Sequence, residues 1–281
     1  MSSSRVVCFL LAIVCLSVVG CAPDQATISP SPSPSPDSTA PVAASTAGVS
    51  DSSDNSGTDQ ALRAKLLTAS FTAINADPAL SGLMTSLAET AIADNCAGCH
   101  GATLEGSKGV PSLADYDWIW GITGEEVTTT EPIHKIMQTV LYGIRDRDCP
   151  DDTKSYGACP DTRYSEMPSY RQLGLTDPQI QDVVEYVLSL SGQEVDAAAV
   201  ARAQEHIGAC TECHAESGMG YKPYGGPDLT DDIWIYGGTR EELFASIADG
   251  RMGVCPPWAN KLDAATIKAL GVYLYRRSMG Y

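Results

Sequence analysis

Two short motifs in the chain carry residues that could do chemistry, and both have the pattern Cys-x-x-Cys-His. They are Cys96-Ala97-Gly98-Cys99-His100 and Cys210-Thr211-Glu212-Cys213-His214. Two cysteines one helical turn apart can form thioethers to the vinyl groups at one edge of a haem, and the adjacent histidine can then bind the iron. The sequence therefore predicts two covalently bound haem c groups, with thioethers from Cys96, Cys99, Cys210 and Cys213 and iron ligation by His100 and His214.

A zinc site and a redox dithiol are the competing interpretations of these motifs. A structural zinc ion needs four ligands, and no second pair of cysteines accompanies either motif. A thioredoxin-like dithiol would lie on a βαβ pattern, which this sequence lacks. Haem c is the interpretation that fits both motifs.

The second axial ligand of each iron decides what the haem can do. The thioether of Met167 would bind the iron opposite His100, an arrangement suited to electron transfer. Cys255 occupies the equivalent position in the second half of the chain. There it would bind the iron opposite His214, and a thiolate ligand would lower the reduction potential. Met252 is the alternative ligand at that second haem, and an open iron is the remaining possibility.

The two motifs begin two copies of a longer pattern. Such internal repetition indicates duplication of a small domain, here over residues 75 to 191 and 197 to 281. The residues that recur in the same order are Pro111, Leu113, Asp115 and Trp118 in the first copy and Pro227, Leu229, Asp231 and Trp234 in the second.

The elements that must position these residues are helices. Apolar residues recur at helical spacing and strand signals are weak, so the predicted fold class is all-α. The expected helices cover residues 87 to 94, 132 to 142 and 178 to 190 in the first copy, and 197 to 207, 240 to 248 and 264 to 276 in the second.

The N-terminus predicts export. Residues 1 to 20 have the charged start and short apolar run of a signal peptide, and the run is shorter than the roughly 20 residues of a bilayer span. Cys21 follows Gly20 as in a bacterial lipoprotein, so we expect lipidation of Cys21; an uncleaved anchor helix is the alternative. Residues 21 to 58 are rich in Ser and Pro, which predicts a disordered, flexible tether. The expected location is the periplasmic side of a bacterial membrane.

Composition narrows the function further. The chain has 281 residues, with 18 Lys plus Arg against 35 Asp plus Glu and a formal charge of −17. Nucleic acid is excluded as a partner because binding phosphates needs a basic face. Ten cysteines indicate an oxidising or metal-binding setting. Cys149 and Cys159 lie in an insertion of the first copy and predict a disulfide, worth about 2 to 3 kcal/mol.

Several longer strings resemble the dihaem subunit III of cbb3-type cytochrome c oxidases. The most specific are Asp117-Trp118-Ile119-Trp120-Gly121, Arg163-Tyr164-Ser165-Glu166-Met167-Pro168 and Gly226-Pro227-Asp228-Leu229-Thr230-Asp231-Asp232-Ile233-Trp234-Ile235-Tyr236-Gly237-Gly238. The resemblance implies two tandem class I-like cytochrome c domains. They would take electrons from a soluble donor cytochrome and pass them to a haem-copper oxidase core, with no catalytic centre in this chain.

The same resemblance implies the axial pairs His100 with Met167 and His214 with the residue at position 255. That family normally carries Met where Cys255 stands, and it is normally held by an N-terminal transmembrane helix. Two alternative functions stay open at this point. One is an electron-transfer subunit of another oxidoreductase, such as a periplasmic dehydrogenase. The other is a dihaem peroxidase or haem sensor, which would need an open iron at the second haem.

Overall fold

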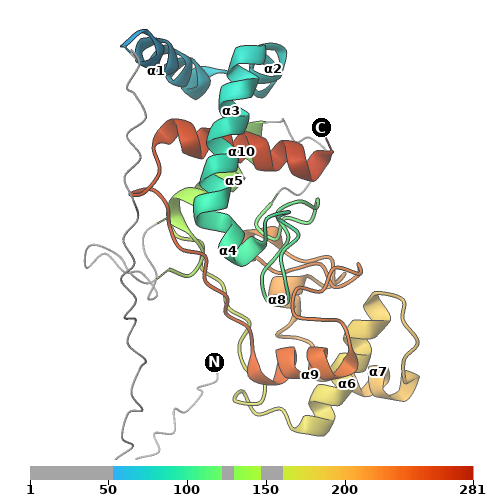
Figure 1. Ribbon diagram of the computed structural model, residues 1–281. Helices are drawn as coiled ribbons and strands as arrows, with labels where there is room; N and C mark the ends of the chain where they lie inside the picture. The colour runs from blue at the N-terminus through green and yellow to red at the C-terminus, as the bar shows by residue number, and fades with distance from the viewer. Residues whose placement is uncertain (1–52, 122–129, 147–160, 281) are drawn as a thin grey trace, which may run out of the picture. The chain divides into compact units, whose positions relative to one another are not determined.

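The computed structural model describes residues 53 to 121, 130 to 146 and 161 to 280 (Figure 1). These ranges are helical and contain no strand, which confirms the predicted all-α class. The elements in chain order are α1 (Ser53–Thr68), α2 (Phe71–Ala76), α3 (Pro78–Ala91), the π-helix η1 (Ile92–Cys96), α4 (Ala97–His100), α5 (Thr130–Tyr142), α6 (Asp177–Leu190), α7 (Ala197–Ala203), α8 (Thr211–His214), the 3-10 helix η2 (Lys222–Tyr224), α9 (Arg240–Asp249) and α10 (Ala264–Met279).

Two helices precede the first one that the sequence predicts. Helix α1 begins at Ser53, so residues 53 to 58 are helical and the predicted tether is too long at its C-terminal end. The side chain of Ser70 caps α2, and that of Asp77 caps α3. Leu66 and Ile74 are fully buried, which ties these helices to the haem-binding part. Within the described ranges, no helix has the length and apolar character needed to cross a membrane.

The buried apolar residues form two cores. The first contains Met84 of α3, Ile133 of α5 and Leu270 of α10. The second contains Val184 of α6 and Ile247 of α9. Helix α10 packs on α3 and α5, whereas α6 packs on α7 and α9 (Figure 1). The two cores have therefore exchanged their closing helices, and neither core follows a single sequence repeat.

The exchange requires the chain to pass twice between the cores, once between α5 and α6 and once between α9 and α10. These two segments, the passages, pair with each other. The N–H of Ile144, just after α5, donates to the carbonyl of Cys255 at 2.9 Å. The N–H of Met167 donates to the carbonyl of Arg251, just after α9, at 3.0 Å. Each pair is completed by the reverse hydrogen bond. The two axial-ligand candidates are thus bound, through their main chains, to segments of the opposite repeat.

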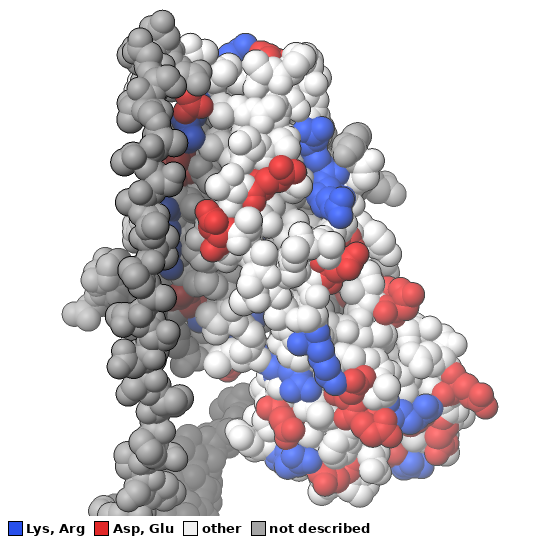
Figure 2. Space-filling view, viewed as in Figure 1, with Lys and Arg blue, Asp and Glu red and all other residues white. Residues whose placement is uncertain are grey.

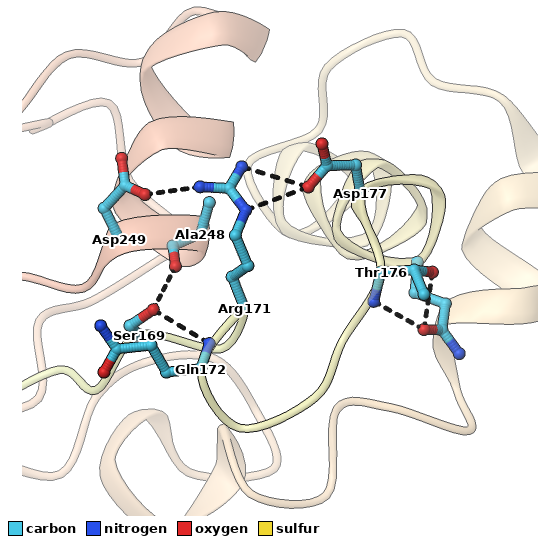
Figure 3. Close-up of polar contacts among 8 residues, drawn as sticks. Ser169, Arg171, Gln172, Thr176, Asp177, Ala248 and Asp249 are labelled. Carbon is cyan, nitrogen blue, oxygen red and sulfur yellow. Dashed lines mark hydrogen bonds and ion pairs between the residues drawn. The ribbon is translucent and has the colours of Figure 1, made fainter. Parts of the chain in front are cut away.

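The loop after Met167 is fastened to α9 (Figure 3). The hydroxyl of Ser169 donates to the carbonyl of Ala248 at 2.6 Å. Arg171 pairs with Asp249 at the end of α9 at 2.8 Å and with Asp177 at the start of α6 at 3.1 Å. Such exposed ion pairs contribute about 1 kcal/mol or less, so the buried core and the main-chain bonds hold this loop in place.

The loop after Cys255 repeats the arrangement on α5. The N–H groups of Trp258 and Ala259 donate to the carbonyls of Val140 and Leu141 at 3.0 and 3.2 Å. The exchange is therefore reciprocal. The loop after Met167 docks on α9 of the second repeat, and the loop after Cys255 docks on α5 of the first repeat.

The cores also meet directly. The ammonium of Lys222 lies 3.2 Å from a carboxylate oxygen of Asp117, and their side chains are only 14% and 11% exposed. The N–H of Gly109 donates to the carbonyl of Ile235 at 2.7 Å. Removing one partner of this pair would leave the other charge nearly buried and unpaired.

Candidate haem sites

The first motif lies where α3 runs on through η1 into α4. Cys96 is the last residue of η1, and Cys99 and His100 lie on α4. The Nδ1 of His100 is 2.9 Å from the carbonyl oxygen of Pro111. Because a carbonyl only accepts, Nδ1 carries the proton and Nε2 keeps its lone pair for a metal.

The second motif repeats this geometry on α8. The Nδ1 of His214 is 3.0 Å from the carbonyl oxygen of Pro227, and Pro227 is the repeat partner of Pro111. Burial lowers the pKa of His214, although the hydrogen bond to Pro227 opposes the change. A neutral imidazole with a fixed tautomer is the form that binds iron.

Among the described residues, no three His, Cys, Asp or Glu side chains gather in a metal-binding group. The two thiols beside each free imidazole nitrogen suit a haem held through thioethers.

Cys255 is coupled electrostatically to the first motif. Charges on Cys96 and Cys99 act on its thiol. Burial, with those two thiols adding to it, raises the pKa of Cys255 to about 11. A metal-bound thiol is deprotonated outright whatever its free pKa, so Cys255 can serve as a thiolate ligand there. Met252 is 48% exposed on the same passage.

Met167 packs on the second core, against which Cys210 of the second motif and Trp234 also pack. Tyr170, three residues further on, is buried, and Cys210 is among the groups that act on its phenol. Burial is the main cause that raises the pKa of this phenol. The sequence-based pairs, His100 with Met167 and His214 with Cys255, stay a prediction, and the packing of Met167 and the coupling of Cys255 favour the crossed alternative.

Helix α6 supplies one wall of the second site. A small cavity beside His214 and Cys210 is lined by Val183, Tyr186 and Leu190 of α6. The first repeat thus contributes its closing helix to the motif of the second repeat, and its Met167 packs on the same core.

Two buried polar atoms match the acidic groups of a haem. Among the described side chains, only the indole Nε1 of Trp118 and the guanidinium Nε of Arg163 are buried without a hydrogen-bond partner. Haem propionates are acceptors that could satisfy such donors. Arg163 also donates to the carbonyl of Trp120 at 2.8 Å and lies over its ring at 5.4 Å. Burial lowers the pKa of Arg163 to about 10.

The sequence analysis assigned no role to Arg163. Its alignment with Arg251 in the repeat could have drawn attention to it. In the structure, Arg251 lies over the ring of Tyr236 at 4.7 Å. The same cation-π contact thus occurs in both halves. Cys21, Cys149 and Cys159, with the predicted lipidation and disulfide, fall outside the described residues.

Comparison with known proteins gives two family matches. The family described as "Cytochrome c" matches residues 86–191. The family described as "Cytochrome C oxidase, cbb3-type, subunit III" matches residues 196–274. Together the matches cover both motifs, one in each.

Curated relatives extend the likeness across both repeats. Cbb3-type cytochrome c oxidase subunit CcoP of Cereibacter sphaeroides is 40% identical over 216 residues, which are 76% of this chain and 68% of the relative. Subunit FixP of a Bradyrhizobium species is 39% identical over 217 residues, 75% of this chain and 67% of the relative. Subunit CcoP of an Azospirillum species is 36% identical over 229 residues, 78% of this chain and 72% of the relative.

Proposed function

This chain belongs to the family of subunit III of the cbb3-type cytochrome c oxidases, and we propose that it relays single electrons from a soluble donor cytochrome to an oxidase core. It is a dihaem c-type cytochrome. The haem supplies the one-electron chemistry, while the protein fixes the axial ligands, shields the site and sets the potential.

Two features of each motif together carry the proposal. Each motif is associated with a sulfur candidate, and the Nδ1 of its histidine is already bonded to a carbonyl oxygen. The axial pairs that we propose are His100 with Cys255 and His214 with Met167. The electrostatic influence of Cys96 and Cys99 on Cys255, and the packing of Met167 on the core that also holds Cys210, support this crossed assignment. Two protein ligands on each iron leave no position for oxygen or peroxide, which suits electron transfer.

The two ligand sets would give the haems unequal potentials. A methionine opposite histidine raises the potential, whereas a thiolate donates electron density and lowers it. The haem held by Cys96 and Cys99 would then be the low-potential centre. The resemblance to that family implies methionine at position 255, so this inequality would be particular to this chain.

Docking to partners would use long-range charge. The chain carries a formal charge of −17, which favours a basic partner and a salt-sensitive association rate. On the face shown in Figure 2, acidic and basic side chains are interspersed. Steering on this face would therefore depend on the net charge more than on one acidic patch.

The anchor that we propose is a lipid on Cys21. The support is the sequence alone, in which a short apolar run ends directly before Cys21. Mass spectrometry of the protein extracted from the membrane is expected to show a chain that begins at Cys21 and carries acyl chains. A chain that still begins at Met1 and has no acyl chains would contradict the lipid anchor and favour an uncleaved N-terminal helix.

The function is tested on the full-length, haem-loaded protein. We expect a reduced soluble cytochrome c to reduce it rapidly in stopped-flow mixing, and an oxidase core to co-purify with it. We also expect the reduced protein not to bind carbon monoxide. Stoichiometric carbon monoxide binding by one haem would contradict the relay and favour a sensor or peroxidase.

A further inference from the structure

Arg145 lies where the two passages between the cores meet. Its Nη1 donates to the carbonyl of Ser165 at 2.5 Å, and its Nε donates to the carbonyl of Gly253. Ser165 stands two residues before Met167, and Gly253 stands two residues before Cys255. One side chain therefore holds equivalent points of both ligand-bearing segments.

The main chain of Arg145 is fixed at the same place. Its N–H donates to the carbonyl of Arg163 at 2.8 Å, and its φ of 56° lies in the left-handed region that non-glycine residues rarely adopt. A non-glycine residue persists there only when its surroundings over-determine it. Here the two carbonyl contacts of the side chain supply that determination.

A guanidinium is suited to this task because its donors form a rigid planar fork. The group is half-buried, and burial lowers the pKa of Arg145, while Tyr236, Tyr164, Cys255 and Glu166 oppose that effect. An arginine stays charged in proteins even so. Charged donors bind carbonyls more strongly than neutral donors, so the two segments are held at a fixed separation.

We propose that Arg145 is a positioning residue shared by the two haem sites, holding the segments of Met167 and Cys255 so that both sulfur atoms reach their irons. The proposal rests on the crossed axial ligands given above. It goes beyond them because it makes the two ligand geometries depend on one residue that binds neither iron.

The test uses the full-length, haem-loaded protein and an Arg145→Gly variant, because glycine accepts a positive φ without strain. Low-temperature EPR follows the thiolate-type low-spin signal, and optical absorption follows the methionine-to-iron charge-transfer band. We expect both features to be lost or shifted together in Arg145→Gly. Arg145→Lys keeps the charge but not the fork, and we expect it to alter both features as well.

The matched control is Arg202→Ala. Arg202 is an exposed arginine that pairs with Asp182 at 2.6 Å and touches neither passage. Arg202→Ala removes one positive charge, as Arg145→Gly does. We therefore expect the thiolate-type EPR signal and the methionine band to stay as in the parent. If Arg145→Gly fails to take up haem, Arg145→Lys carries the same expectation.

The outcomes separate the inference from its premise. A parent protein that lacks the thiolate-type or the methionine-type feature overturns the crossed ligands, and this inference with them. A parent that has both features, and an Arg145 variant in which either feature is unchanged, overturns only the shared positioning role.

Discussion

The main chains of Ile144 and Cys255 exchange two hydrogen bonds, at 2.9 and 3.1 Å, although the two residues belong to different sequence repeats. This pairing brings the segment of Cys255 to the end of α5 and so to the first Cys-x-x-Cys-His motif. Its counterpart joins Met167 to Arg251. Together they make the two haem sites a single interlocked structure, in which each motif depends on the other repeat for its closing helix.

Replacing Cys255 with methionine tests the ligand of the first haem. We expect Cys255→Met to remove the thiolate-type EPR signal. The potential of one haem should rise by tenths of a volt, within the ~0.8 V range that axial ligands span. The control is Met252→Leu, because Met252 is 48% exposed, and it should leave the spectrum unchanged. A spectrum altered by Met252→Leu and not by Cys255→Met would assign the ligand to Met252.

Two glycines offer a paired test of the crossed arrangement. Gly143 and Gly250 have φ values of +71° and +76°, and an added Cβ would collide with the carbonyl oxygens of Cys255 and Met167, respectively. Each substitution to alanine also costs about 1 to 2 kcal/mol in backbone strain.

We therefore expect Gly143→Ala to perturb the thiolate-type signal and Gly250→Ala to perturb the methionine band, as measured by EPR and optical absorption. In an uncrossed protein the effects would be exchanged, because Gly143 would then act on the methionine of its own repeat. That exchange of effects would refute the crossed assignment.

The ion pair between the cores should matter for stability. Lys222→Ala would leave the carboxylate of Asp117, only 11% exposed, without its partner. We expect a loss of about 3 kcal/mol in the free energy of unfolding, at the lower end for a broken buried pair. Lys65→Ala is the control, because Lys65 is 59% exposed and pairs with Asp77 on the surface. Its loss should stay below about 1 kcal/mol, and equal losses in the two variants would show that Lys222 is not special.

Glu185 should make the second core sensitive to acid. Its carboxylate binds Arg240 at 2.6 Å and accepts from the N–H of Asp196. The hydrogen bond to Arg240 is the largest cause that holds the pKa of Glu185 below its ordinary value of 4.5. A lowered carboxyl pKa stabilises the fold above the unfolded-state pKa, and that stabilisation disappears as the pH falls through the folded-state pKa.

We therefore expect the free energy of unfolding to fall from about pH 5 downward, with a smaller fall in Glu185→Gln, which cannot titrate. Chemical denaturation across this range measures both slopes. Identical slopes in parent and variant would mean that Glu185 does not contribute to the acid sensitivity.

Much of the local structure could be predicted from the sequence. The two Cys-x-x-Cys-His motifs needed no tertiary information, because thioether spacing and the adjacent ligand are contained within five consecutive residues. The closing helices α6 and α10 were predicted from helical periodicity, which is also local. Helices α1 and α2 were not predicted, because the polar start of α1 resembles the predicted tether.

The sequence by itself determined the cofactor, the helical class and the three sulfur candidates Met167, Cys255 and Met252, since each depends on residue type and short spacing. Only the tertiary structure decided which sulfur lies beside which motif. The two repeats share the same helical pattern, so sequence similarity alone cannot say whether α6 or α10 closes a given core. The contacts that made this choice are long-range and exist only once the cores have assembled. They are the hydrogen bonds between Ile144 and Cys255 and between Met167 and Arg251. The hydrogen bonds of the Arg145 side chain to both passages belong to the same set.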